Sequence, residues 1–139
     1  MQLMRKVILA VTAGLCAVLL AGCGNNSPGD AQQTALTALG KQLPKPYRDG
    51  LITDSAHLQG ADIVLVVRFP DATVDMAKAK PDVFAALRRD ENQAIAELCA
   101  EPALQPVFAA GGGVQRRFVD ANGAVFFNVA LKASDCTTH

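Results

Sequence analysis

Apolar and polar residues alternate most regularly between Ala61 and Phe69 of the 139-residue chain. One side of this two-residue period is apolar throughout, and it is formed by Ile63, Leu65, Val67 and Phe69. The other side carries Val64 and Val66, so the stretch is rich in β-branched residues and predicts a strand near the centre of a sheet. A weaker strand from Gly50 to Leu58 precedes it, and the Gln59-Gly60 turn between the two predicts a hairpin.

A second hairpin is predicted near the C-terminus. Val114 to Asp120 and Ala124 to Lys132 both alternate, and the Asn122-Gly123 pair between them tolerates the positive φ of a tight turn. In the last strand every other residue is apolar and is expected to face the core, namely Val125, Phe127, Val129 and Leu131.

Two helices are predicted from apolar residues at helical spacing. The first runs from about Ala31 to Leu43, and the second begins at Pro81 and runs to about Cys99, with a polar middle at Arg88–Glu91. Pro70 to Lys80 has no clear period and is expected to be a loop. A short, weak helical turn is expected from Pro102 to Phe108.

The order of these elements is helix, hairpin, long helix, hairpin. Two hairpins joined by a helical crossover predict an α+β fold, with a single antiparallel sheet of about four strands and helices on one face.

The N-terminus has the pattern of a secretory signal. Arg5 and Lys6 supply a positive start, the stretch from Val7 to Leu20 is apolar, and Ala21-Gly22 provides the small residues that a signal peptidase needs. We therefore expect residues 1–22 to form a signal peptide.

Cys23 directly follows Leu20-Ala21-Gly22, and this context resembles the lipobox of bacterial lipoproteins. The resemblance implies that Cys23 receives a diacylglyceryl thioether and becomes an acylated N-terminus, and several acyl chains hold a protein on a membrane far more firmly than one. The alternative is an uncleaved anchor with an incidental cysteine, although the apolar run falls short of the roughly 20 residues of a spanning helix. Gly24 occupies the position where inner-membrane lipoproteins tend to carry Asp, which favours the periplasmic face of the outer membrane.

The remaining chain is expected to comprise a short lipidated tether, residues 23–30, and a single α+β periplasmic domain, residues 31–139. Without the signal the chain has 117 residues (139 minus 22), the size of one domain. It keeps eleven Lys and Arg residues (13 minus Arg5 and Lys6) against 13 acidic residues, a formal charge of −2. Neither nucleic acid nor an anionic lipid surface is therefore an expected partner.

Cys99 and Cys136 are the cysteines that remain once Cys16 leaves with the signal and Cys23 is lipidated. In an oxidising compartment two cysteines allow one intramolecular pairing, so we expect a Cys99–Cys136 disulfide. Two free thiols or a metal pair are the alternatives, but no His, Asp or Glu lies near either cysteine at the spacing of a zinc site.

No catalytic arrangement is found in the sequence. Asp54, Ser55 and His57 lie on one predicted strand, where neighbouring residues point to opposite faces, so Asp54 cannot orient His57 toward Ser55. The triplet Gly111-Gly112-Gly113 precedes a strand rather than a helix and lacks the helix N-terminus that binds phosphate. We therefore expect no enzyme activity, no cofactor and no metal.

Several short motifs are spread over the mature chain. They are Leu43-Pro44, Gly50-Leu51-Ile52, Gly60, Cys99, Gly113-Val114, Asp120, Gly123 and Lys132-Ala133-Ser134-Asp135-Cys136. Together with the lipobox, the disulfide and the αββαββ order, they resemble the α/β-type pilotins of type II secretion. The chain departs from that pattern after Cys99, where two prolines and a glycine triplet occur. The resemblance implies a non-enzymatic adaptor that grips a C-terminal helix of the secretin subunit and carries it to the outer membrane.

The leading hypothesis is thus a pilotin-like, protein-binding lipoprotein of the outer membrane that takes part in secretin targeting. The alternative is an immunity lipoprotein that neutralises an antibacterial effector in the periplasm. The partner is accordingly a secretin helix or an effector protein.

Two places are expected to suit such a partner. One is a groove beside the long helix at its polar middle, Arg88–Glu91. The other, which we favour, is the short helix that carries Val107 and Phe108, because Phe108 is an aromatic anchor beside a glycine hinge. The alternative for Phe108 is that it fills the core. Arg116 and Arg117 alternate across a strand, so at most one of them can face a partner.

Overall fold

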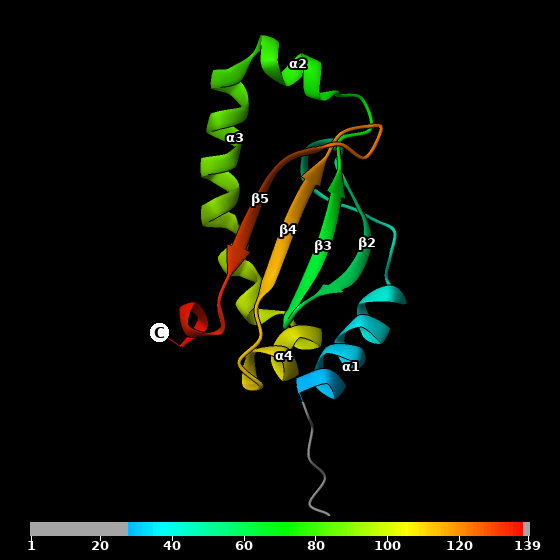
Figure 1. Cartoon of the computed structure of the whole chain (residues 1–139), viewed down its shortest axis with the longest axis vertical. Helices are drawn as coiled ribbons and strands as arrows, with labels where there is room; N and C mark the ends of the chain where they lie inside the picture. Colours follow the sequence, from blue (N-terminus) through cyan, green and yellow to red (C-terminus); the bar gives the residue numbers. More distant parts are fainter. Residues whose placement is uncertain (1–27, 138–139) are drawn as a thin grey trace, which may run out of the picture.

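The computed structural model describes residues 28–137 of the chain. One sheet of five strands, in the order β1-β2-β3-β4-β5, forms the centre of the domain (Figure 1). The strands are β1 (Lys45–Pro46), β2 (Ile52–Gln59), β3 (Asp62–Arg68), β4 (Val114–Val119) and β5 (Val125–Leu131).

The sheet confirms the α+β class and both hairpins, and it corrects two details of the prediction. It has five strands rather than about four, because the two-residue β1 pairs antiparallel with the start of β2 (Lys45 with Thr53, Pro46 with Ile52). It is also mixed rather than purely antiparallel, since β3 and β4 run parallel from the Ile63–Val114 pair onward. The helical crossover between the hairpins returns the chain to the end of the sheet at which β3 starts. β4 therefore runs in the same direction as β3.

The helices are α1 (Pro28–Gly40), α2 (Val74–Ala79), α3 (Pro81–Ala94) and α4 (Gln105–Ala109), with 3₁₀ turns η1 (Arg48–Gly50), η2 (Ile95–Ala100), η3 (Pro102–Leu104) and η4 (Ala133–Cys136). α1 begins and ends about three residues earlier than the helix predicted from Ala31 to Leu43. Its first turn therefore includes the last residues assigned to the tether. The expected loop from Pro70 to Lys80 contains α2, which Thr73 caps by accepting a hydrogen bond from the Met76 amide at 3.3 Å. The long helix also changes to 3₁₀ geometry at Ile95 instead of continuing to Cys99.

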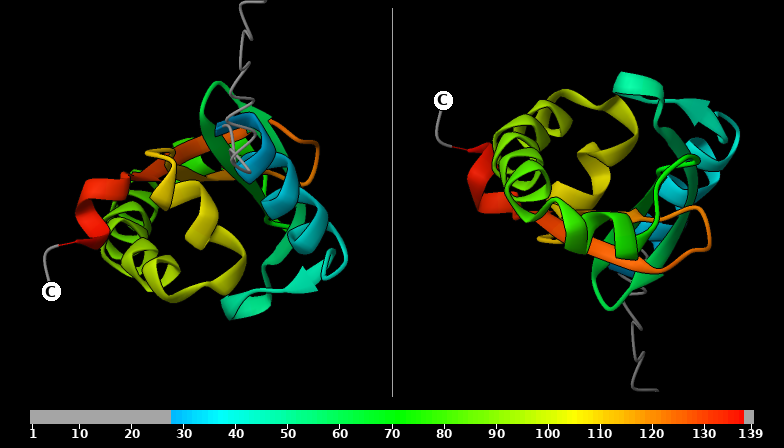
Figure 2. Two further views of the ribbon diagram at one scale, coloured as in Figure 1. Left: turned by 90° about the horizontal axis from the view of Figure 1, so that it is seen from below. Right: turned by 90° about the horizontal axis from the view of Figure 1, so that it is seen from above.

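The core lies between one face of the sheet and the helices (Figure 2). The sheet contributes apolar residues of β3, β4 and β5 that face the helices, namely Ile63, Leu65, Val67, Val114, Phe118, Phe127, Val129 and Leu131, all buried. Phe118 stacks on Phe127 with 4.6 Å between ring centroids, which fixes the β4–β5 register at the centre of this face. Val125, which was expected to face the core, is instead 49% exposed.

The expected disulfide between Cys99 and Cys136 is present, with a Cα–Cα distance of 5.3 Å. It joins η2 to η4 and thereby fixes the C-terminal segment against the segment that follows α3. Within residues 28–137, no helix has the length and apolar character needed to cross a membrane.

Asp120 connects the β4–β5 turn to α2. Its carboxylate accepts hydrogen bonds from the amides of Asn122 and Ala124, both at 2.8 Å, and from the amide of Val74 at 3.1 Å. Burial raises the pKa of this carboxyl, but the backbone hydrogen bonds outweigh burial and hold the pKa below its ordinary value.

Candidate functional site

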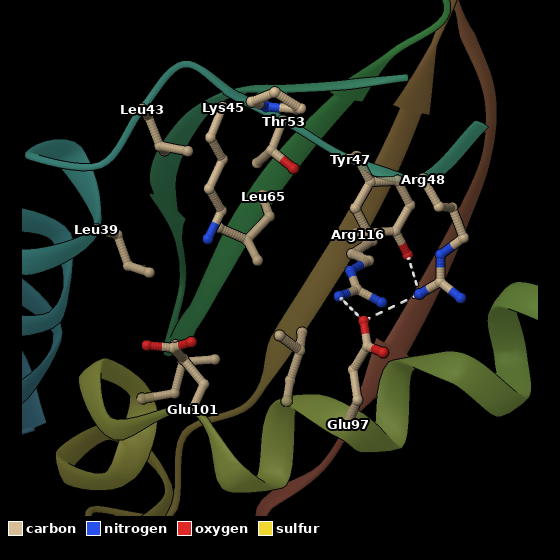
Figure 3. A pocket seen from close by; sticks show the side chains of 13 residues that line it. Leu39, Leu43, Lys45, Tyr47, Arg48, Thr53, Leu65, Glu97, Glu101 and Arg116 are labelled. Atoms are coloured by element: carbon tan, nitrogen blue, oxygen red, sulfur yellow. Dashed lines mark hydrogen bonds and ion pairs between the residues drawn. The ribbon is translucent and has the colours of Figure 1, made fainter. Parts of the chain in front are cut away.

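The candidate site is an open groove of about 460 Å³ between the C-terminal end of α1, the β1–η1 segment and the η2–η3 segment (Figure 3). Its floor is the helix-covered face of the sheet. The lining residues are Leu39, Leu43, Lys45, Pro46, Tyr47, Arg48, Thr53, Leu65, Glu97, Leu98, Glu101, Leu104 and Arg116. A volume of this size falls in the range of small-molecule binding pockets, about 300–1,000 Å³.

One part of the groove is apolar. Its leucines come from four elements: Leu39 and Leu43 from α1 and the residues after it, Leu65 from β3, Leu98 from η2 and Leu104 from η3. Leu43 is only half-buried, whereas the other four are buried. This part can therefore take an apolar side chain from a partner, and Leu43 is the leucine that such a side chain reaches from solvent.

The other part is a cluster of charges (Figure 3). Glu97 Oε1 accepts hydrogen bonds from Arg116 Nη2 at 2.6 Å and from Arg48 Nη2 at 2.9 Å. Arg116 comes from the middle of β4 and its side chain is only 5% exposed, whereas the side chain of Glu97 is 51% exposed at the mouth of the groove. Charge-assisted hydrogen bonds of this kind hold the two guanidinium groups in fixed positions.

Behind this cluster lies Glu91 of α3, the carboxylate of which is buried. Glu91 Oε2 accepts a 2.8 Å hydrogen bond from the Tyr47 hydroxyl, and its carboxylate lies 3.6 Å from Arg48 Nε and 3.9 Å from Arg116 Nη1. Within the described part of the chain, Arg116 Nη1 is buried without a hydrogen bond, and Glu91 supplies a compensating charge on that side of the guanidinium. Because an unpaired buried charge is costly, Glu91 and Arg116 each require the other.

Tyr47 is enclosed by this cluster. The guanidinium carbons of Arg48 and Arg116 lie 4.7 Å and 4.8 Å from its ring centroid, and Phe118 contacts it edge-on at 6.3 Å. Burial raises the pKa of the Tyr47 hydroxyl well above its usual range, and the hydrogen bond to the Glu91 carboxylate raises it further. The hydroxyl is therefore a permanent donor to Glu91 at neutral pH.

Lys45 differs from the two arginines of the groove, because no carboxylate among residues 28–137 pairs with it. Its side chain extends from β1 into the groove (Figure 3), and within residues 28–137 it forms no ion pair at 4.0 Å or less. The lining thus contains three cations, Lys45, Arg48 and Arg116, against the carboxylates of Glu97 and Glu101. An acidic group on a bound partner would complement Lys45.

The residues that the sequence favoured for partner binding lie elsewhere. Val107 is fully buried in the core, and Phe108 is half-buried and packs against it. Two of the three glycines after α4 are closely packed, since a Cβ on Gly112 would lie 2.6 Å from the Ala61 carbonyl oxygen and one on Gly113 would lie 2.8 Å from that of Leu131. Gly111 is exposed, with a φ of 80° and nothing within 4 Å of its Cβ position. A binding role for Val107 and Phe108 stays a prediction. Cys23 lies outside the described residues.

This groove was not predicted from the sequence, although the sequence contains one signal for it. Period two places Arg116 on the same face of β4 as Val114 and Phe118, and both of these face the core. A cation on a core face requires a buried carboxylate, and Glu91, read as part of an exposed polar middle of the long helix, is that group. Only Arg88, Arg89 and Asp90 of that middle are exposed.

The groove is lined by leucines, cations and carboxylates. Among residues 28–137, no three His, Cys, Asp or Glu side chains are grouped so that they could hold a metal ion. Asp54, which the sequence placed near His57, pairs instead with Arg68 on the neighbouring strand.

Comparison with known proteins gives a likeness of fold alone. No protein-family model and no curated protein matches the chain. Two solved structures are similar to it. A putative secreted protein from Pseudomonas aeruginosa has a TM-score of 0.55 at 9% identity, over 81% of this chain and 97% of that one. The pilotin EpsS of the Vibrio vulnificus type 2 secretion system has a TM-score of 0.54 at 13% identity, over 81% of this chain and 96% of that one.

Proposed function

We propose that this chain is an outer-membrane-anchored periplasmic lipoprotein that binds a partner protein without catalysing a reaction, in the manner of a pilotin. The partner segment is an amphipathic helix, and by the pilotin resemblance it is the C-terminal helix of a secretin subunit. The fold likeness to a type 2 secretion pilotin supports the proposal. The observation that carries it is the groove, which combines buried leucines with fixed charges in one open cavity.

The groove suits an amphipathic helix for a physical reason. A helix presents apolar side chains at positions i, i+3 or i+4, and i+7 on one face, and such anchors fill apolar pockets on a partner. The leucines between α1 and η3 form the pocket for those anchors. Glu97 and Lys45 lie where the polar flank of the helix would pass. We therefore expect the bound helix to carry an acidic residue beside its apolar stripe, because Lys45 forms no ion pair with the other residues of the range 28–137.

The test is a binding titration with a matched pair of variants. Leu43→Glu places a charge in the apolar part of the groove, and Val83→Glu makes the same change at a 60% exposed position on α3. The probe is a fluorescein-labelled peptide of the secretin C-terminus from the same genome, titrated with purified mature lipoprotein in detergent and followed by anisotropy. Leu43→Glu should weaken binding at least about tenfold, or about 1.4 kcal/mol, while Val83→Glu should leave it unchanged.

Two controls make the result decisive. Thermal unfolding of both variants must match that of the wild type, since half-buried Leu43 also contacts the fold. A scrambled peptide of equal charge must not bind. Equal affinity for the wild type and a folded Leu43→Glu variant would move the binding site away from the groove. If the secretin peptide fails to bind and the effector encoded by a neighbouring gene binds instead, the immunity function replaces the pilotin-like one.

A further inference from the structure

Three segments meet at the end of the domain where α1 begins (Figure 1). They are the first turns of α1, the β2–β3 turn Leu58–Ala61, and the α4–β4 loop Ala109–Gly113. Gln32 Nε2 donates a 2.5 Å hydrogen bond to the Ala61 carbonyl, and Gly112 packs so closely on the same carbonyl that it has no room for a Cβ. The two loops, called here the neutral end, therefore form one continuous surface beside the start of α1.

The neutral end is depleted of charge. No residue from Pro102 to Gln115 is charged, and none from Ser55 to Ala61 carries a formal charge. Asp62, at the inner margin of this surface, is half-buried and accepts hydrogen bonds from the Gly113 amide at 3.0 Å and from Gln115 Nε2 at 2.9 Å. Three charged residues border it, namely Asp30 in the first turn of α1, Lys132 beside the loop, and Arg117, which donates a hydrogen bond from Nη2 to Gln59 Oε1.

The opposite end of the domain has the reverse character. Five charged residues, all exposed, occur between Pro70 and Asp82, in and around α2, namely Asp71, Asp75, Lys78, Lys80 and Asp82. Charge is thus distributed unevenly along the long axis of the molecule, and α2 and the start of α3 form the charged end (Figure 1).

Chain length then decides which end lies near the lipid. In the proposed lipoprotein Cys23 carries the acyl chains, and Pro28 begins α1 only five residues later. Even fully extended, that connection spans at most about 17 Å. The start of α1, and the neutral end beside it, therefore cannot lie far from the headgroups.

We propose that the neutral end lies against the phospholipid surface that holds Cys23, so that the domain stands on the membrane in one orientation. This inference rests on the lipid anchor of the proposed function. Approach of charged side chains to a bilayer strips water from them at a cost, and a chain with a formal charge of −2 is repelled by anionic lipids. The neutral end avoids both penalties and presents Leu58, 39% exposed, with exposed Gln59, Gly60, Ala61 and Ala109.

The orientation also places the groove. Leu39 lies eleven residues after Pro28 along α1, and a rise of 1.5 Å per residue separates them by about 16 Å along the helix axis. At this end of α1 the groove is set back from the start of the helix, whereas its η3 wall leads directly into α4 beside the neutral end.

The experiment measures the distance of each end from the headgroups in the intact lipoprotein. Ala61→Cys and Ala109→Cys place a fluorophore on the neutral end, and Met76→Cys and Val83→Cys place it at the charged end on residues 51% and 60% exposed. The added thiol is the only reactive one, since Cys23 is a thioether and Cys99 and Cys136 are bonded. Each labelled protein is reconstituted into vesicles of phosphatidylethanolamine and phosphatidylglycerol that contain a headgroup spin-labelled lipid as quencher.

Labels at Ala61 and Ala109 should be quenched several-fold more strongly than labels at Met76 and Val83. Equal quenching at both ends, or stronger quenching at the charged end, would overturn the orientation. Weak quenching of the labelled protein, together with disulfide-linked dimers when unlabelled Ala109→Cys is oxidised, would assign the neutral end to a second copy of the chain and also overturn it.

Mass spectrometry of the N-terminal peptide separates this inference from the function on which it rests. An unmodified Cys23 would overturn the anchor and the orientation together. An acylated Cys23 with an unquenched label at Ala109 would overturn the orientation alone, and peptide binding in the groove would remain to be judged by its own titration.

Discussion

Replacing Glu91 tests whether the charge cluster behind the groove holds the domain together. Glu91 is 1% exposed, and its carboxylate lies 3.9 Å from Arg116 Nη1, a buried atom without a hydrogen-bond partner among residues 28–137. Glu91→Met removes the charge and keeps a side chain of similar length that fills its space. The variant then leaves Arg116 with Glu97 alone, at 2.6 Å on its other nitrogen.

The expected loss of stability follows from the burial of the pair. Removal of one partner of a buried ion pair costs about 3–5 kcal/mol, because the remaining charge is uncompensated. Arg116 retains Glu97, which places Glu91→Met near the lower limit, about 3 kcal/mol. The Tyr47 hydroxyl loses its acceptor as well, a change that contributes about 1 kcal/mol. Against a total of about 5–15 kcal/mol for a domain of this size, the variant should be visibly destabilised.

The assay is urea unfolding at pH 7 followed by circular dichroism, with the disulfide intact. Asp90→Ala, at the exposed neighbouring position, is the control and should change the free energy of unfolding by less than about 0.5 kcal/mol. The decisive variant is Glu91→Met with Arg116→Met. If the penalty comes from an unpaired charge, removing Arg116 should recover most of the stability lost in the single variant.

Two results would refute this reasoning. A loss below about 1 kcal/mol in Glu91→Met would mean that Glu97 and solvent compensate Arg116 without Glu91. A double variant less stable than Glu91→Met would mean that Arg116 contributes through packing on Tyr47 rather than through charge.

Three further predictions concern other parts of the chain. Cys99→Ser or Cys136→Ser should cost about 2–5 kcal/mol in urea unfolding, because the bond closes a long loop, and quantitative alkylation of the unreduced wild type would contradict the bond. Hydrogen bonds depress the folded pKa of Asp120, so its contribution is present above the ordinary pKa of about 3.9 and is lost as pH falls through the folded pKa. Asp120→Asn should therefore be less stable than the wild type at pH 7, with the difference shrinking below about pH 4; a constant difference would refute this. Phe108→Ala should lower the melting temperature by several degrees without weakening binding of the peptide if Phe108 belongs to the core, and the reverse outcome would restore it as a partner contact.

The sequence predicted the central strands well because their pattern is local. A period of two over β3 specifies which residues face the core, and Ile63, Leu65 and Val67 are buried as that period requires. The Asn122-Gly123 turn has the same property, since Gly123 adopts a φ of 86° that favours glycine. Patterns of this kind need no knowledge of the rest of the chain.

The features that the sequence did not predict depend on distant residues. β1 is two residues long and includes a proline, so it has no period to detect and exists because β2 offers an edge. Glu91 resembles its exposed neighbours Arg89 and Asp90 until Arg116, on β4, is placed opposite it. The groove has the same origin, because its lining comes from segments between Leu39 and Arg116 that share no motif.

The width of the groove depends on the charge cluster more than on the backbone. The β1–η1 segment, which forms one wall, pairs with β2 at the two residues of β1, and the Tyr47 amide donates a hydrogen bond to the Leu51 carbonyl at 2.8 Å. Beyond them, Tyr47 bonds to Glu91 on α3 and Arg48 bonds to Glu97 on η2, so side chains connect this wall to the opposite one. The Cys99–Cys136 disulfide fixes η2 from the other side. Four of the five leucines are already buried in the domain, so the position of the walls matters most for half-buried Leu43. Buried and half-buried charges hold both walls in place and keep Leu43 within reach of a partner helix.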